Sequence, residues 1–380
     1  MRKISKAASL FLLGLMLSGC SMKNIEAQAY AVSMGIDLTD EGSISVSVQV
    51  PALSQSGGGG GSSGDSGSEG GGGGYTFSQA EGKTLTAALE MLNAGVPREL
   101  NLTGVKSVVV SEKLAGSERF SEVLKELALA YRVYGAAEMV VCMGEAAEFI
   151  KNQKPVIGLR LSESTAVALS HYQEYGYVPS AKAADIFYLS RSFYGDPVAI
   201  LAAGGAEKDK MSGNGVESYA DTLPDTGEKQ NRYFGSALFS EGRMVGRLTG
   251  AQTQLLSALL GNIEYFSWVI GETPVRINIS GSPRVDIDLS GAVPQIDVEL
   301  TINMMESEGG LEPETLRQET VRRLNELTRI CQECGSDPFR YAETAARQFL
   351  TVQEWLHYDW KTRFRSAQIR YTVEVRRIEL

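Results

Sequence analysis

Histidine is scarce in this chain, which has only His171 and His357 among its 380 residues. Neither histidine has a credible serine, cysteine or acidic pair beside it, so the chain has little for general acid–base catalysis. Carboxylates are plentiful, and a hydrolase with two acidic groups stays open, but no local pattern singles out a pair. We therefore assign no catalytic residue and no cofactor, and we expect a protein that is not an enzyme.

The chain also lacks basic clusters and long apolar runs. Its 36 Lys and Arg residues are outnumbered by 46 Asp and Glu residues, which gives a formal net charge of −10. An acidic chain without a Lys/Arg block has little to offer a phosphate backbone, so we expect no nucleic acid as a partner. Beyond the N-terminal segment, no stretch approaches 18 uninterrupted apolar residues, so no later part is expected to span a bilayer.

Cysteine is scarce too, and the four cysteines are Cys20, Cys142, Cys331 and Cys334. Cys142 lies in an apolar run and is expected to be a small buried residue. Cys331 and Cys334 have the C-x-x-C spacing of a zinc half-site or a redox pair, but zinc needs four ligands and the chain has no second C-x-x-C. We favour a thiol pair at the end of a helix, either reduced or joined in a disulfide, and predict no metal site.

The N-terminus has the pattern of a lipoprotein signal peptide. Basic residues precede an apolar run at residues 10–17, which is too short to cross about 30 Å of hydrocarbon. The segment closes with a lipobox, formed by Leu17, Ser18, Gly19 and Cys20. Its small residues fit a signal-peptidase groove, and its cysteine thiol takes diacylglycerol before cleavage. We expect residues 1–19 to be removed and Cys20 to anchor the protein to the outer face of the cytoplasmic membrane.

Period-two alternation predicts a strand at residues 44–50, and the turn residues before it indicate a hairpin. A Gly/Ser tract at residues 54–74 is typical of a flexible coil, because it has no apolar side chains to bury. Helix and strand patterns then alternate up to residue 200: helices at 84–92 and 120–131, and strands at 105–110 and 138–143.

The strongest periodic signals lie in the C-terminal part. Three alternating strands are predicted at residues 277–279, 285–289 and 296–304, followed by helices at 314–334 and 337–353 and a closing strand at 369–375. The first of these helices has a single apolar stripe, formed by Leu316, Thr320, Leu324, Leu327 and Cys331.

These patterns predict an α+β fold with two to three mixed α/β domains, in which helices flank the sheets. The predicted parts are a tether at 20–24, an N-terminal α/β domain at 25–200 with the insertion 54–74, a polar linker at 201–231 and a C-terminal α/β region at 232–380. The C-terminal region is open to a further division into subdomains 232–275 and 276–380.

Several short motifs resemble those of one family. The pattern Trp355-x4-Trp360-x3-Phe364 before the last strand resembles the C-terminal signature of the spore germinant receptor C-subunit lipoproteins, the Ger(x)C-type spore germination proteins. The lipobox is similar, as are six further motifs in family order: Gly35-Ile36-Asp37, residues 80–85, Arg98-Glu99-Leu100, residues 235–239, Met244-Val245-Gly246 and Gln332-Glu333-x3-Asp337. Two features depart from the pattern: residues 21–26 lack the usual Trp-Asp after the lipidated cysteine, and the Gly/Ser tract is long.

The resemblance implies a lipid-anchored subunit of a nutrient germinant receptor on the outer face of the spore's inner membrane. It implies assembly with two integral-membrane subunits, one of them permease-like, and a fold of three mixed α/β domains. No catalytic role comes with the family. Two rivals stay open: a lipid-anchored solute-binding protein of a transporter, which predicts two similar lobes around a cleft, and a secreted lipoprotein enzyme.

The aromatic residues Trp355, Trp360 and Phe364 are the ones that could serve in binding. One interpretation is that they close the core over the last strand. The other is that an exposed part of the cluster anchors a partner, because aromatic side chains dominate interface hot spots. Both interpretations stay open from the sequence.

Overall fold

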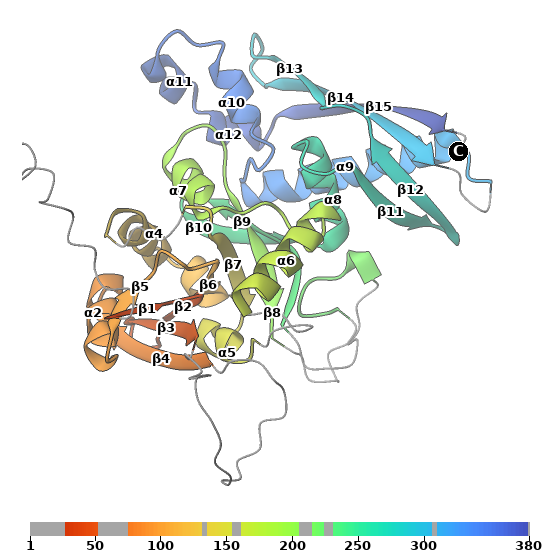
Figure 1. Cartoon of the computed structure of the whole chain (residues 1–380). Helices are drawn as coiled ribbons and strands as arrows, with labels where there is room; N and C mark the ends of the chain where they lie inside the picture. The colour runs from red at the N-terminus through yellow and green to blue at the C-terminus, as the bar shows by residue number, and fades with distance from the viewer. Residues whose placement is uncertain are drawn as a thin grey trace, which may run out of the picture.

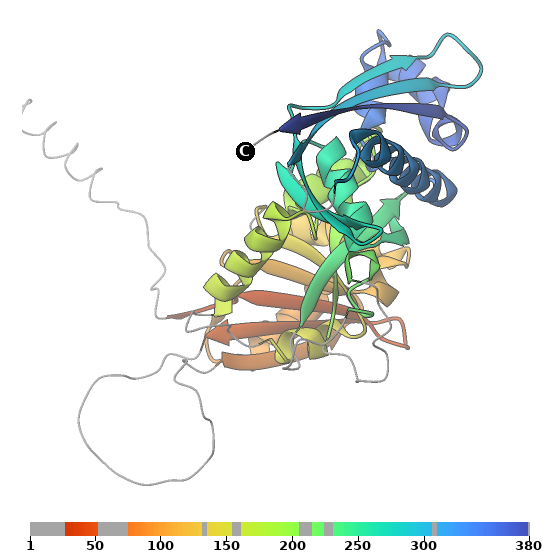
Figure 2. The same cartoon turned by 90° about the vertical axis from the view of Figure 1, so that its right-hand side faces the viewer.

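The computed structural model describes residues 27–51, 75–130, 135–153, 161–204, 215–223, 231–305 and 310–378. The lipobox, the tether and the Gly/Ser tract lie outside these residues. The described chain forms two large sheets with flanking helices, which confirms the predicted α+β fold (Figure 1). The chain runs from the larger sheet at one end of the molecule to the smaller sheet at the other (Figure 2).

The larger sheet has eight strands in the order β10-β9-β8-β7-β6-β2-β3-β4. Its strands are β2 (Ser33–Leu38), β3 (Ile44–Pro51), β4 (Tyr75–Gly82), β6 (Ser107–Ser111), β7 (Glu138–Met143), β8 (Val198–Ala203), β9 (Arg232–Ser240) and β10 (Arg243–Leu248). The four central strands are parallel, and antiparallel strands complete both sides. The predicted hairpin is confirmed as β2–β3.

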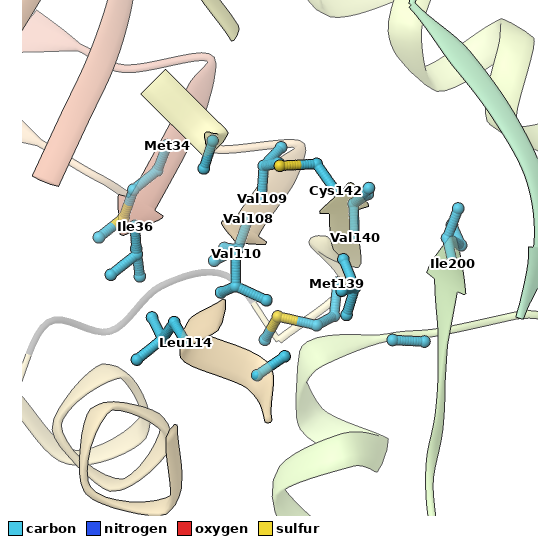
Figure 3. Packing of buried hydrophobic residues seen from close by; sticks show 14 of the residues in the cluster. Met34, Ile36, Val108, Val109, Val110, Leu114, Met139, Val140, Cys142 and Ile200 are labelled. Carbon is cyan, nitrogen blue, oxygen red and sulfur yellow. The ribbon is translucent and has the colours of Figure 1, made fainter. Parts of the chain in front are cut away.

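The centre of this sheet is apolar on both faces. All residues of β6 are buried, as expected for a parallel strand covered on both sides, which reads as a continuous apolar run rather than an alternating one. Figure 3 shows side chains from β2, β6, β7 and β8 packed against one another, with Cys142 among them. The predicted burial of Cys142 is confirmed.

Seven helices and a short 3-10 helix of the described residues accompany this sheet: α2 (Leu85–Gly95), α3 (Glu112–Ala115), α4 (Arg119–Ala130), α5 (Ala146–Lys151), α6 (Leu161–Glu174), α7 (Ala183–Arg191), α8 (Gly250–Leu259) and η3 (Gly215–Glu217). Thr84 caps α2, because its hydroxyl accepts the N–H of Ala87. The positions of α2 and α4 confirm the helices predicted at 84–92 and 120–131. A parallel pair, β1 (Gln28–Tyr30) and β5 (Glu99–Asn101), lies at the N-terminal end.

The larger sheet continues past the predicted linker. β9 and β10 follow it in sequence, yet β9 pairs with β8 and β10 with β9. Tyr233 and Phe239 of β9 belong to the core of the larger sheet, whereas Leu238 belongs to the other core. Residues 201–231 are therefore not a boundary between sheets, and the strands within 232–275 are divided between both. The division into independently folding domains stays a prediction.

The smaller sheet has five strands: β11 (Tyr265–Ile270), β12 (Thr273–Ile279), β13 (Arg284–Asp288), β14 (Gln295–Met305) and β15 (Gln368–Ile378). β14 pairs with β12 and β13 in antiparallel fashion, and with β15 in parallel along its whole length. Alternate residues of β14 are buried, so one face of the sheet covers a core. The strands predicted from alternation are confirmed, while β11 had not been predicted.

The helix α9 (Pro313–Cys334) packs on this sheet and contacts β15. The five residues of the predicted apolar stripe are all buried, so the sequence periodicity identified the packed face. The single helix predicted at 337–353 is wrong. The short helix α10 (Tyr341–Ala346) lies within this range, and a second helix, α11 (Val352–Tyr358), starts at its end. The hydroxyl of Thr351 caps α11, because it accepts the N–H of Glu354.

Candidate functional site

The three predicted aromatic side chains come together beside the smaller sheet. Trp355 lies on α11, and Trp360 and Phe364 lie on α12 (Trp360–Phe364). The ring centroids of Trp355 and Trp360 are 5.8 Å apart, and those of Trp360 and Phe364 are 6.1 Å apart. The three side chains are only 3%, 6% and 1% exposed, and they belong to the core of the smaller sheet.

A tight link between two helices produces this arrangement. Asp359 ends α11 and starts α12 in a left-handed conformation with φ 54°, and its carboxylate accepts the N–H of Thr362. An aspartate tolerates this conformation better than most residues, because its short side chain bonds nearby backbone groups. The turn brings Trp355 of α11 and Trp360 of α12 close enough for their rings to pack against each other.

The aromatic cluster holds a loop from the N-terminal half of the chain. The loop connects α7 to β8, and in Figure 1 it rises beyond α7 toward α12. The indole N–H of Trp355 donates to the carbonyl of Phe193 in this loop, over 3.1 Å. Trp355 therefore has its polar atom satisfied by a residue from the other half of the molecule, and it joins the two halves.

Two buried aspartates form the second link of this junction. The backbone N–H of Asp196 donates to the carbonyl of Asp337 over 2.9 Å, and the N–H of Asp337 donates to the Asp196 carboxylate over 2.9 Å. Lys361 lies 3.1 Å from the other carboxylate oxygen of Asp196. The Asp337 carboxylate accepts three N–H groups, from Tyr341, Ala342 and the Trp360 indole.

Burial controls the charge of this pair. Loss of water raises the pKa of Asp337 to about 7, with the nearby charge of Asp196 adding to the rise and the donated N–H groups opposing it. Burial also raises the pKa of Asp196, although the positive charge of Lys361 opposes this shift. Lys361 thus pairs with Asp196, whereas the Asp337 carboxylate is bound by donated N–H groups. A pKa of about 7 leaves Asp337 partly protonated near neutral pH.

A pocket of about 310 Å³ lies at this junction. Trp355, Trp360 and Phe364 line it from the C-terminal half, and Phe193 and Asp196 line it from the loop after α7. Apolar walls with a few convergent polar groups are typical of a binding site, and the volume is at the lower end of the range for such sites. We therefore treat this junction pocket as the candidate functional site.

The two histidines and the C-x-x-C pair lie outside the junction pocket. Cys331 and Cys334 occupy the last turn of α9, and both thiols are free. Burial raises the pKa of each thiol, which makes both poor nucleophiles. No group of three or more His, Cys, Asp or Glu side chains in the described part of the chain could hold a metal ion.

The lipobox residues Leu17, Ser18, Gly19 and Cys20 are outside the described residues, so lipidation at Cys20 stays a prediction. Within the described ranges, no helix combines the length and the apolar character needed to cross a membrane.

Asp196 and Lys361 were not predicted as site residues from the sequence, and Asp337 was named only as the last residue of the Gln332-Glu333-x3-Asp337 motif. One signal was present: Asp196-Pro197 and Asp337-Pro338 are the two Asp-Pro dipeptides of the sequence. Asp-Pro favours a turn, and a pair of such turns is unusual enough to compare. The pairing itself could not be predicted, because the two turns lie far apart in the sequence.

Comparison with known families matches both halves of the chain. Residues 21–203 match the spore germination protein N-terminal domain. Residues 234–379 match the C-terminal domain described as spore germination B3/GerAC like. No curated protein matches the sequence.

The matched ranges cover most of the chain and include both sheets and the junction between them. This α+β chain is therefore a spore germination protein, and it belongs to the Ger(x)C family, as its motifs indicated. The crystal structure of the GerBC protein has a similar fold, with a TM-score of 0.53. The match has 13% sequence identity and covers 91% of this chain and 97% of that one, so it shows a shared fold.

Proposed function

We propose that this protein is the lipid-anchored, non-catalytic C subunit of a nutrient germinant receptor. It is held by lipid on Cys20 at the outer face of the spore's inner membrane, and it acts through contacts with two integral-membrane subunits, one of them permease-like. The observation that carries this proposal is the match of spore germination domains to residues 21–203 and 234–379.

The geometry supports a binding role rather than catalysis. The two buried carboxylates of the junction pocket are engaged in holding two parts of the chain together: Asp337 caps a helix and binds an indole, and Asp196 binds Lys361. No histidine is among the described residues that line the pocket, and the polar contacts of the two carboxylates come from backbone N–H groups, an indole and Lys361 rather than from a serine or cysteine. This pair therefore lacks the arrangement that general acid–base catalysis uses.

The rival solute-binding function predicts two similar lobes around a cleft. The two sheets differ in this chain: the larger has eight strands with a parallel centre, and the smaller has five strands in which only β14 and β15 are parallel. This asymmetry favours the receptor subunit over the rival.

Affinity isolation from spore membranes tests the proposal. The tagged chain is solubilised in a mild detergent, and the proteins that accompany it are identified by mass spectrometry. We expect a permease-like protein and a second integral-membrane subunit. Recovery of a transporter permease with its ATPase would establish the rival instead, and recovery of the chain alone would contradict the proposal.

The same spores test the anchor. Cys20→Ala should release the protein from the membrane fraction, because the variant lacks the thiol that accepts lipid. Cys334→Ser is the matched control, since it also removes one thiol but leaves the lipobox intact, and it should stay in the membrane fraction. Full membrane retention of Cys20→Ala would show that lipid on this residue is not the anchor.

A further inference from the structure

The mouth of the junction pocket exposes large apolar side chains. Phe193 and Leu356 both line the pocket, and they are 59% and 45% exposed. Val352 lies one helical turn before Leu356 on α11, on the same face, and is also exposed. Single exposed apolar residues are ordinary, but several around one pocket are typical of a contact surface.

The pocket also has an excess of acidic side chains. Four carboxylates line it, and two basic groups accompany them: Asp196, Glu241, Asp337 and Asp359, with Arg191 and Lys361. Lys361 is engaged by Asp196, and the Arg191 guanidinium lies over the Phe187 ring, 5.8 Å from its centre. Among the described residues, Glu241 and Asp359 have no basic partner within salt-bridge distance. Arg191 keeps its positive charge, so the two unpaired carboxylates leave a small excess of negative charge beside the exposed apolar side chains.

One polar group inside the pocket has no partner either. Ser190 lines the pocket, but its hydroxyl is shielded from solvent and has no hydrogen-bond partner in the described structure.

We propose that the junction pocket binds a polypeptide segment of an integral-membrane partner, which inserts an apolar side chain beside a lysine or arginine. The apolar side chain would lie against Trp355 and Leu356, and the basic group would meet Glu241 at the mouth. An apolar anchor in a pocket with complementary charge at the rim is the usual composition of an interface hot spot. This inference deepens the proposed function and rests on it for the identity of the partner.

Both halves of the chain contribute side chains to the junction pocket. Phe193 comes from the loop after α7, Glu241 from the β9–β10 turn and Leu356 from α11. A segment bound there would contact both matched domains at once, and it would depend on the pairing of Asp196 with Asp337. Binding by the partner and the packing of the two halves are therefore coupled.

Photocrosslinking in spore membranes tests the inference. A benzophenone amino acid replaces Leu356 in the full-length chain, and the control carries it at Met91, which is exposed on α2 at the far end of the molecule (Figure 1). After irradiation, position 356 should crosslink to an integral-membrane receptor subunit, at a peptide with Lys or Arg within one turn of the apolar contact. Crosslinking to lipid, to a second copy of this chain or to an acidic segment would overturn the inference.

Charge reversal provides the second arm. Glu241→Lys should lower the yield of the crosslink from position 356 about tenfold, because it replaces attraction by repulsion at the mouth of the pocket. Glu90→Lys makes the same change on the exposed surface of α2 and should leave the yield unchanged. Equal yields in the two variants would contradict the role of charge.

The two proposals fail in distinguishable ways. If affinity isolation recovers the receptor subunits but position 356 captures none of them, the pocket is not the docking site and the receptor function stands. If affinity isolation recovers no integral-membrane subunit, the proposed function fails as well.

Discussion

Asp196 and Asp337 are joined by reciprocal bonds: the backbone N–H of each donates to an oxygen of the other, and both distances are 2.9 Å. Each of the two residues precedes a proline, which has no N–H to donate, and in each loop the aspartate supplies the backbone donor of this contact. This pair joins the family's N-terminal and C-terminal domains at one buried point.

The first prediction concerns the pH dependence of stability. Burial raises the pKa of Asp337 from 3.8 to about 7. Because the folded value lies above the unfolded one, the stability linked to this proton is complete below about pH 4 and is lost as the pH rises through 7. Relative to the wild type, Asp337→Asn should therefore gain about 2 kcal/mol of unfolding free energy between pH 5 and pH 8.

Urea unfolding of both proteins at the two pH values measures this difference. Asp286→Asn removes an exposed carboxylate from β13 and should show no comparable change. If the unfolding free energies of wild type and Asp337→Asn differ by the same amount at pH 5 and pH 8, Asp337 does not titrate in this range.

The second prediction concerns Gly235, where β9 passes close to the end of β10. Its φ is 90°, and a Cβ there would lie 2.4 Å from the carbonyl oxygen of Leu248, so Gly235→Ala meets both strain and a clash with the backbone. We expect a loss of about 3 kcal/mol or more in unfolding free energy. Gly42→Ala has a similar φ of 80° with open space around it, and should cost only about 1 kcal/mol. Similar losses for the two variants would disprove the clash.

The third prediction concerns the aromatic cluster. Trp360→Ala should reduce the unfolding free energy by about 3–5 kcal/mol, because it leaves a cavity and removes the indole donor of Asp337. Val352→Ala, on the exposed surface of the neighbouring helix, should change it by less than about 0.5 kcal/mol. Thermal or urea unfolding followed by circular dichroism compares them, and a small loss for Trp360→Ala would place its side chain outside the core.

The fourth prediction concerns the C-x-x-C pair. Because burial raises the pKa of both thiols, native protein at pH 8 should react slowly with iodoacetamide at Cys334 and still more slowly at Cys331. Addition of urea should make both react fast. Mass spectrometry of the alkylated peptides measures this, and rapid alkylation of both cysteines in the native protein would contradict the raised thiol pKa values.

The sequence was most informative where the periodicity was strong. The stripe on α9 and the alternation in β14 identified buried faces correctly, because each element packs only one of its faces. β11 was missed: its outward residues include Val269, so its pattern of exposure does not follow polarity. The helix at 337–353 was wrong because Thr351 starts a new helix within a continuous helical pattern.

The junction could be predicted only in part. Trp355, Trp360 and Phe364 were selected from the sequence, since their spacing before the last strand was recognisable. Their neighbours Asp196 and Phe193 come from a loop more than a hundred residues earlier, and no local pattern connects them to α11 or α12. The return of β9 to the first sheet was missed for the same reason, because strand pairing across a polar segment leaves no periodic signal.

The most direct test of the receptor function is the reciprocal isolation. A tag is placed on the permease-like subunit instead, and this chain is quantified in the complex purified from spores of the wild type and of Cys20→Ala. The account predicts that the wild-type chain is recovered in fixed proportion to the permease-like subunit, and that recovery falls sharply for Cys20→Ala. Absence of the wild-type chain from that complex would contradict the account.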